Sequence, residues 1–237
     1  WRYQFKALSD RWRVIAWNAP GYILTDNLRK DRPDCNDYAD AFAAFADAMG
    51  VQRFVMVGNS FGSAVAQCFA ERYPARVIRL AMSGTSVGAK STPADVREKT
   101  FKRRQQQFEA AGGMKYARDV IKLLVGPATR KEAWEEVMEV LRATNGRAYL
   151  QASFVPYELD TLAFAAKLTL PVLIYHGTED KIAPIERTSA ALAKLLPDVS
   201  ELSGRPDLAF LGGPVARDRM ILLIRASTAP QASARVL

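Results

Sequence analysis

Gly58-Asn59-Ser60-Phe61-Gly62 is the stretch of this sequence that decides its fold. It matches the pattern G-x-S-x-G and follows Phe54 to Val57, an apolar run without polar alternation. Such a run is typical of a strand that is buried on both faces. Residues 63–73 then predict a helix that ends before Pro74. A strand, a tight turn and a helix in this order would project a serine hydroxyl above the carboxyl edge of a sheet.

This placement predicts nucleophilic chemistry at Ser60. Small residues are needed on both sides of so sharp a turn, and Gly58 and Gly62 meet that need. The backbone N–H of Phe61, at the start of the helix, is expected to face a developing oxyanion. The alternative is a turn serine between two glycines that has no chemical role, and the strand–turn–helix context favours the nucleophile.

The chain has 237 residues, of which 49% are hydrophobic, so it can form one sizeable domain. Its formal charge of +8 is compatible with a nucleic acid, an anionic membrane surface or an anionic substrate. We find no nucleic-acid motif, and Lys102-Arg103-Arg104 is interpreted as a solvated helix face. No apolar run approaches the roughly 20 residues of a membrane helix, so no membrane partner is expected.

Cys35 and Cys68 form neither a metal-binding spacing nor a disulfide framework, and we expect no metal. Cys68 falls in an apolar helical stretch and is expected to be buried. This use of thiols suits a reducing cytoplasm, which is where we place the protein. No signal peptide is visible, although the first residue is Trp1 and not Met.

Strands and helices alternate along the chain, with one long interruption. Strands are expected at Arg13–Trp17, Phe54–Val57, Val77–Met82 and Pro171–Tyr175, and helices at 36–49, 63–73, 185–196 and 214–225. Residues 93 to about 165 instead repeat apolar positions at helical spacing between glycine-containing breaks. This pattern predicts a mostly parallel α/β sheet with a helical cap, and the tail from Ser227 onward is expected to be loose.

Two stretches around the motif resemble the α/β-hydrolase family. Trp12–Tyr22 is similar to a family strand and the loop after it, and Val65–Val77 is similar to the helix behind the nucleophile and the next strand. The resemblance covers nearly the whole chain. Asn59 is similar to the residue found in C–C bond hydrolases of aromatic-ring cleavage, whereas Ser83–Gly88 looks more like 3-oxoadipate enol-lactonases.

The resemblance implies three segments and a reaction class. Residues 1–90 would form the core with the nucleophile elbow, 91–168 the helical cap and 169–237 the C-terminal part of the core. The family reaction is hydrolysis of an ester, a lactone or a related carbonyl substrate through a serine acyl-enzyme, without a cofactor. Cofactor-free perhydrolases, which resemble the same serine triad, are a further possibility. Epoxide hydrolases and haloalkane dehalogenases use an aspartate where this chain has Ser60.

The family's carboxylate and histidine are sought near the C-terminus. His176–Pro184 is similar to the segment that carries the carboxylate, with Asp180 at that position and Glu179 as the alternative. Its expected role is to orient and stabilise an imidazolium. Asp207 stands where the family has its histidine, and an aspartate, with a usual pKa near 3.9, cannot replace that base at neutral pH.

The chain's single histidine, His176, is expected to be structural, since it lies at the end of a strand. We also expect that the strand and loop with the second oxyanion donor would precede Trp1, so that the first strands of the family sheet are missing. A loss of the histidine costs serine hydrolases roughly 10⁶ in kcat.

Three hypotheses follow for the activity. The chain is a hydrolase, or a non-catalytic ligand-binding protein on the same fold, or a shortened or altered form of an active enzyme. The substrate would be a small carbonyl compound. Residues 97–131 contain ten Lys or Arg and three Asp or Glu. If they form a basic lid, the substrate would be anionic. Trp134 and Phe154 are candidate pocket residues, but aromatic residues at helical spacing are more often core. The oligomeric state is left open.

Overall fold

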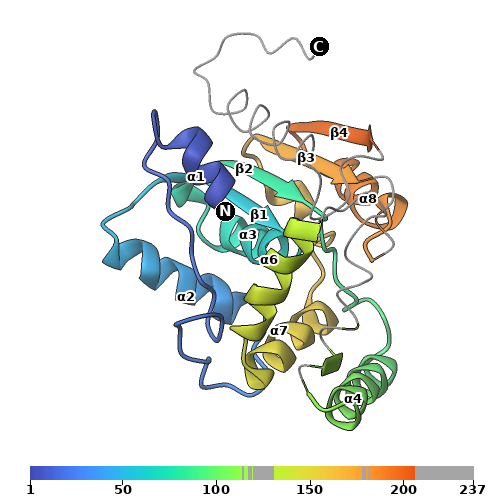
Figure 1. Cartoon of the computed structure of the whole chain (residues 1–237). Coiled ribbons are helices and arrows are strands. Elements are labelled where there is room, and N and C mark those ends of the chain that lie inside the picture. Colours follow the sequence, from blue (N-terminus) through green and yellow to red (C-terminus); the bar gives the residue numbers. More distant parts are fainter. Residues whose placement is uncertain (114, 117–118, 120–130, 178–179, 181, 206–237) are drawn as a thin grey trace.

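The computed structural model describes residues 1–113, 115–116, 119, 131–177, 180 and 182–205. In this part of the chain four parallel strands form one sheet in the order β1-β2-β3-β4 (Figure 1). Their bounds are Phe54–Asn59 for β1, Val77–Ser83 for β2, Val172–Gly177 for β3 and Val199–Arg205 for β4. Because all four strands run in the same direction, their carboxyl ends meet at one edge of the sheet.

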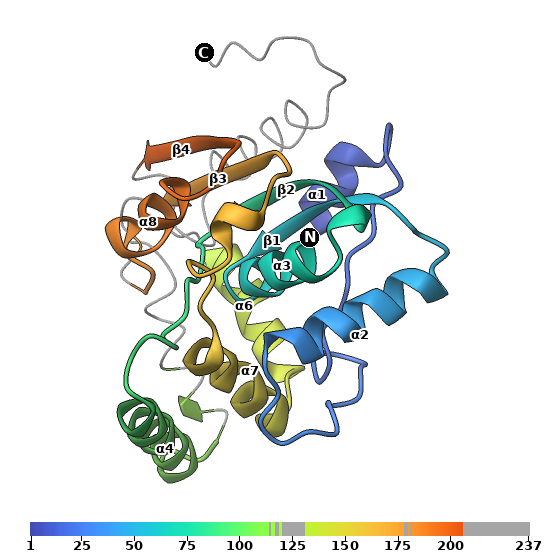
Figure 2. The same ribbon diagram turned by 180° about the vertical axis from the view of Figure 1, so that it is seen from behind.

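Two helices cover one face of the sheet and form the main core. Helix α3 (Phe61–Arg72) packs directly on β1, and α2 (Cys35–Ala48) packs against α3 from outside (Figure 2). Helix α2 begins at a capping box, in which Asp34 and Asp37 each accept a hydrogen bond from the other's backbone N–H. The buried core includes Phe69 on α3 and Ile174 on β3, both 0% exposed.

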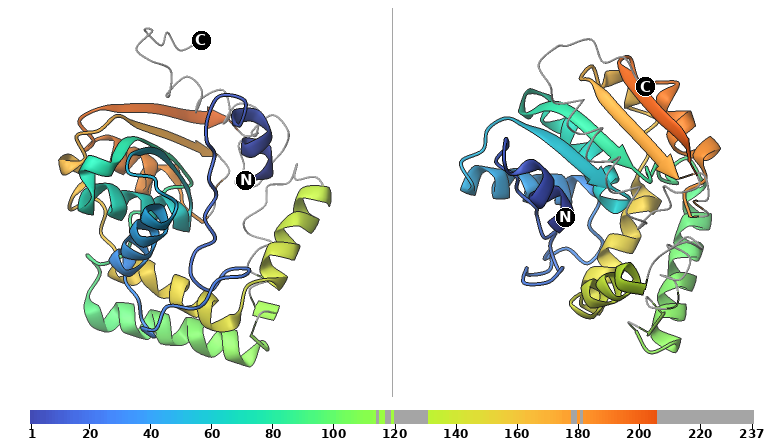
Figure 3. Two further views of the ribbon diagram at one scale, coloured as in Figure 1. Left: turned by 90° about the vertical axis from the view of Figure 1, so that its left-hand side faces the viewer. Right: turned by 45° about the horizontal axis from the view of Figure 1, so that its top comes forward.

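The remaining helices lie around this core. They are α1 (Arg2–Leu8), α4 (Ala94–Ala110), α6 (Lys131–Arg142), α7 (Gly146–Glu158) and the short α8 (Ser189–Ala193), with 3₁₀ turns at Pro74–Arg76, Ala165–Lys167 and Ile185–Arg187. Figure 3 shows α1 on the opposite side of the sheet from α2 and α3. Helix α8 contacts β3 on the same side as α3.

Helices α4, α6 and α7 occupy the chain between β2 and β3 and lie together below the sheet in Figure 1. Phe101 of α4 packs edge-on against Phe154 of α7, with ring centroids 4.9 Å apart. An ion pair between Arg2 and Glu136 joins α6 to α1. The helical insertion expected between two halves of the sheet is therefore present.

The structure differs from the sequence predictions at three places. Arg13–Trp17 is not a strand, because no described strand lies beside it to pair with its backbone groups. Strand β4 was not predicted. The helix expected over 185–196 is shorter, since Thr188 leaves helical geometry at φ −123° and ψ −91° and only Ser189–Ala193 is α-helical. The helix expected at 214–225 and the tail lie outside the described residues.

Candidate active site

Ser60 lies alone between the end of β1 and the start of α3, at the carboxyl edge of the sheet. Its backbone has φ 51° and ψ −116°, a conformation that residues with side chains rarely adopt. The Ser60 carbonyl accepts hydrogen bonds from the Ser63 backbone N–H at 2.8 Å and from the Ser63 hydroxyl at 2.6 Å. The sharp strand–turn–helix predicted from the motif is thus present, with a strained serine at its apex.

The two glycines of the motif have different roles. A Cβ at Gly58 would lie 2.5 Å from the Gly62 carbonyl oxygen and 2.8 Å from the Ser63 Cα, so only glycine lets the helix approach the strand this closely. A Cβ at Gly62 would meet no described atom within 4 Å. The expectation that both flanking positions must be small is correct for Gly58 and finds no steric support at Gly62.

Ser60 is half-buried, and among the described residues no group hydrogen-bonds its hydroxyl. Phe61 is the first residue of α3, so its N–H has no helical partner, and no described carbonyl accepts it. The Phe61 ring packs edge-on against the buried ring of Tyr38, with centroids 4.9 Å apart. This packing fixes the first turn of α3, whose positive end lies next to Ser60.

Asp180 follows β3 at the same carboxyl edge of the sheet. Its side chain is 7% exposed and accepts hydrogen bonds from the backbone N–H groups of Ile182 at 2.9 Å and Ala183 at 2.8 Å. Burial by itself would raise the pKa of Asp180, but its contacts with His176 and with these two N–H groups outweigh burial and lower the pKa. Asp180 is therefore an ionised carboxylate at neutral pH.

His176, on β3, is bound within the protein and does not contact Ser60. Its Nδ1 lies 2.5 Å from the Ser189 hydroxyl, which in turn lies 2.7 Å from the Thr85 hydroxyl. Its Nε2 lies 3.4 Å from the Asp180 carboxylate. Serine, histidine and aspartate thus meet here, but Ser189 and His176 are 0% and 1% exposed, so no substrate can reach Ser189. This arrangement agrees with a structural histidine.

The structure brings Ser60 and Asp180 to one edge of the sheet, yet the described contacts of Asp180 do not include Ser60. Asp207, at the position of the expected histidine, and Glu179 both lie outside the described residues. Sequence reasoning did not find the Ser189 and Thr85 partners of His176. No motif marks them, since they come from separate segments that meet only in the folded chain.

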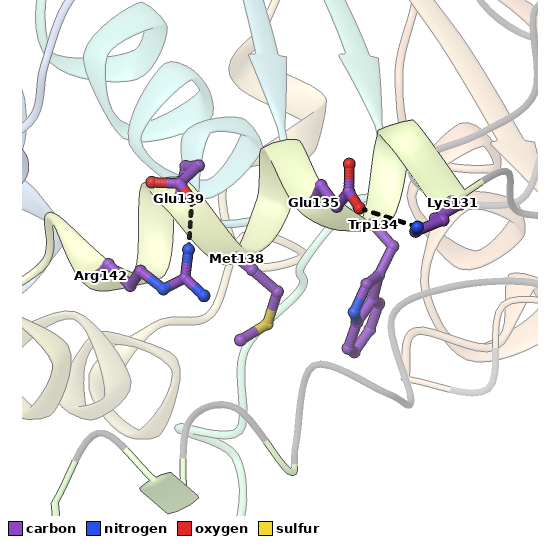
Figure 4. A pocket seen from close by; sticks show the side chains of 6 residues that line it. All are labelled: Lys131, Trp134, Glu135, Met138, Glu139 and Arg142. Atoms are coloured by element: carbon purple, nitrogen blue, oxygen red, sulfur yellow. Dashed lines mark hydrogen bonds and ion pairs between the residues drawn. The ribbon is translucent and has the colours of Figure 1, made fainter.

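A surface hollow of about 340 Å³ lies beside α6 (Figure 4). Its lining consists of Lys131, Trp134, Glu135, Met138, Glu139 and Arg142. The Trp134 and Met138 side chains point to the same side of the helix, and ion pairs flank them. Phe154, the other aromatic candidate, is instead buried at 9% exposure in the packing of α7.

Neither a metal centre nor a membrane span is found in the described part of the chain. No group of three His, Cys, Asp or Glu side chains there is placed to hold a metal ion. None of the described helices has the length and apolar character needed to cross a membrane.

Comparison with known proteins identifies the family. A sequence model of the alpha/beta hydrolase fold matches residues 1–207. The chain belongs to the alpha/beta hydrolase fold family. The family resemblance and the parallel α/β fold expected from the sequence are thereby confirmed, and the alpha/beta hydrolase fold explains why the strained serine stands between a buried strand and a helix.

Several hydrolases are similar to this chain over most of its length. A bifunctional esterase/perhydrolase of Acinetobacter calcoaceticus is 26% identical, over 80% of this chain and 72% of its own. A 2-hydroxy-6-oxo-2,4-heptadienoate hydrolase of Pseudomonas putida is 27% identical, over 83% and 71%. A 2-hydroxy-6-oxononadienedioate/2-hydroxy-6-oxononatrienedioate hydrolase of a Pseudomonas species is 27% identical, over 74% and 63%.

Solved structures show the same fold. A thermophilic esterase from Thermogutta terrifontis superposes with a TM-score of 0.79 at 22% identity, over 95% of this chain and 82% of that one. The meta-cleavage product hydrolase CumD of Pseudomonas fluorescens gives a TM-score of 0.71 at 19% identity, over 94% and 82%. At these identities the likeness concerns the fold alone.

Proposed function

We propose that this chain acts as a serine hydrolase on a small carbonyl substrate, with Ser60 as the nucleophile. The observation that carries the proposal is the strained serine, at φ 51°, between a buried strand and the N-terminus of a helix. Such a conformation costs about 1–3 kcal/mol, and strained backbone of this kind clusters at active sites. The similar esterase and C–C bond hydrolases support a carbonyl substrate.

In the proposed reaction the Ser60 Oγ attacks the substrate carbonyl carbon, and its proton passes to a general base that then returns it to the leaving group. The N–H of Phe61 donates a hydrogen bond to the oxyanion, and collapse of the tetrahedral intermediate releases the protonated leaving group. Water then attacks the acyl-enzyme, which frees the acid and restores the Ser60 hydroxyl. Asp180 is proposed to orient a cationic base, and Asp207 marks the position from which the family supplies that base.

The helical insertion is proposed to be the cap of residues 91–168, placed between core segments 1–90 and 169–237. A preference for anionic substrates has limited support from the described basic residues of the cap. Arg97, Lys102 and Lys131 each lie within 4 Å of a glutamate carboxylate, so part of the positive charge is neutralised. We propose esters, lactones and C–C bonds beside a carbonyl as the substrate classes, and a cytoplasmic location.

A second candidate function is ligand binding without catalysis. It is favoured by the engagement of the only histidine, His176, with Ser189 and Asp180. The same fold would then hold a carbonyl compound that is not cleaved. The two functions differ in whether Ser60 reacts.

The deciding experiment measures hydrolysis of a short-chain p-nitrophenyl ester together with labelling by a fluorophosphonate, on protein of verified intact mass. Because Asp207 stands where the family has its histidine, we expect slow turnover and one label on Ser60 in the wild-type chain, and neither in Ser60→Ala. The control is Ser91→Ala, which removes an exposed serine away from the elbow and should behave as wild type. A neutral and a carboxylated ester, compared in the same assay, report charge preference.

Equal inertness of the wild type and Ser60→Ala, with no label on Ser60, would exclude the serine mechanism and favour ligand binding. Turnover that survives in Ser60→Ala would place the nucleophile elsewhere. The loss expected on removing the nucleophile of a fully equipped serine hydrolase is about 10⁶ in kcat.

A further inference from the structure

Three polar side chains cross the sheet in one row, immediately behind the candidate nucleophile. Asn59 ends β1, Ser83 ends β2 and Tyr175 is on β3. The strand register pairs Asn59 with Ser83 and Ser83 with Tyr175, so the three residues are direct neighbours. Residues paired in register on neighbouring strands point to the same face of a sheet. The row therefore lies on one face at the carboxyl edge, next to Ser60.

Ser83 holds the turn through two separate hydrogen bonds. Its hydroxyl donates to the Asn59 side-chain oxygen at 2.5 Å. Its backbone carbonyl accepts the N–H of Ser60 at 2.9 Å. Ser83 is 7% exposed, so water does not compete for these groups. One residue thus fixes both the strained serine and the residue before it.

Tyr175 supports Ser83 from the other side. The two residues are paired in register, and the contact with the Ser83 side chain lowers the pKa of Tyr175 against the larger effect of burial. Since the Ser83 hydroxyl donates its proton to the Asn59 side-chain oxygen, the Ser83 oxygen can still accept a hydrogen bond. Burial raises the pKa of Tyr175 to about 12, so the phenol is protonated at neutral pH and can donate to that oxygen.

We propose that Ser83, oriented by Tyr175, is a positioning residue that holds the strained turn at Ser60. A backbone in a sparsely populated region persists only where surrounding contacts over-determine it. The Ser63 contacts fix the helix side of the turn, and the row from Tyr175 to Asn59 fixes the strand side. For catalysis, this inference rests on the proposed function of Ser60. The role of Ser83 in holding the turn is independent of that function.

The test compares Ser83→Ala, Ser83→Thr, Tyr175→Phe and Thr161→Val. Thr161 is the matched control, because it is a fully buried hydroxyl that donates to the Ser86 carbonyl and hydrogen-bonds none of Asn59, Ser60 and Ser83. Two quantities are measured in each variant: kcat and KM for the ester, and the hydrogen-exchange rate of the Ser60 amide by NMR. Thermal unfolding shows whether each variant folds.

We expect Ser83→Ala to lower kcat about ten-fold at unchanged KM and to speed Ser60 amide exchange by a similar factor, which corresponds to one ordinary hydrogen bond. Tyr175→Phe should show a smaller effect of the same kind, and Ser83→Thr, which keeps the hydroxyl, should recover most of both. Thr161→Val should change neither quantity beyond what its loss of stability explains.

The inference is overturned if kcat and Ser60 amide exchange in Ser83→Ala match those of Thr161→Val. It is also overturned if KM changes in place of kcat. If the wild-type chain shows neither ester turnover nor a label on Ser60, only the proposed function is refuted. The amide-exchange rate of Ser60 still decides whether Ser83 holds the turn. If Ser83→Ala does not fold, the folded Tyr175→Phe variant gives the same two readings.

Discussion

At the scale of single residues, the candidate site depends on a few close backbone approaches. Ser60 has an unfavourable φ of 51°, and Gly58 lies where α3 passes directly over the end of β1. The absence of a side chain at Gly58 therefore permits the turn, whereas the contacts of Ser60 with Ser63 and Ser83 maintain it. Alanine substitutions at the two glycines of the motif should therefore differ in their effect on stability.

Alanine at Gly58 should destabilise the protein, whereas alanine at Gly62 should not. A Cβ at Gly58 would lie 2.5 Å from a backbone oxygen, and the strand and helix would have to separate. We expect Gly58→Ala to lose about 3 kcal/mol, the upper part of the range for forced overpacking. Gly62→Ala, inside α3, should be neutral or gain up to about 1 kcal/mol. Urea unfolding of both variants measures the difference, and equal stabilities would refute this account of the elbow.

At the scale of secondary-structure elements, the sequence predicted those whose signal is local. Strands β1, β2 and β3 are near-continuous apolar runs, as parallel strands buried on both faces require. The sequence of β4, Val199–Arg205, has only two apolar side chains among polar residues and a glycine. Its place is set by pairing with β3, which a local pattern does not contain. Arg13–Trp17 has a strand-like composition but no described partner strand.

The same distinction applies to the site. Ser60 was predictable, because strand, turn and helix are consecutive in the sequence. The contacts of His176 with Ser189 and of Ser83 with Asn59 join residues that are far apart or on different strands. No spacing rule reveals them. They depend on the register of three strands and on where α8 begins.

Helix α2 is expected to depend on its N-terminal cap. The Asp34 side chain accepts hydrogen bonds from the backbone N–H of Asn36 at 2.8 Å and of Asp37 at 3.1 Å. Replacement by alanine leaves these donors without a partner and should cost about 1 kcal/mol. Asp34→Asn is the control, since asparagine caps equally well. Chemical unfolding with circular dichroism measures both, and an alanine variant as stable as the asparagine variant would contradict the role of the cap.

At the scale of the whole molecule, one core connects segments from both ends of the described chain. Its buried residues come from α2, α3, strands β1, β2 and β3, the end of α7 and α8. If helix α2 separated from α3, buried apolar surface of the shared core would become exposed to water. This shared core predicts a single cooperative unfolding transition for the described part.

The reactivity of the two cysteine thiols can test whether the core unfolds in a single transition. Cys35 on α2 and Cys68 on α3 are each 5% exposed and in contact with one another, and this contact together with burial raises the pKa of Cys35. A neutral aromatic disulfide reagent should therefore react with neither thiol in the folded protein and with both after unfolding. Across a urea titration, we expect the reactivity midpoint to coincide with the midpoint from circular dichroism. Cys68→Ala, with one thiol, should give half the reaction at its own unfolding midpoint. Thiol reaction at urea concentrations where the circular dichroism is still native would mean that α2 opens on its own, and that the core does not unfold as one unit.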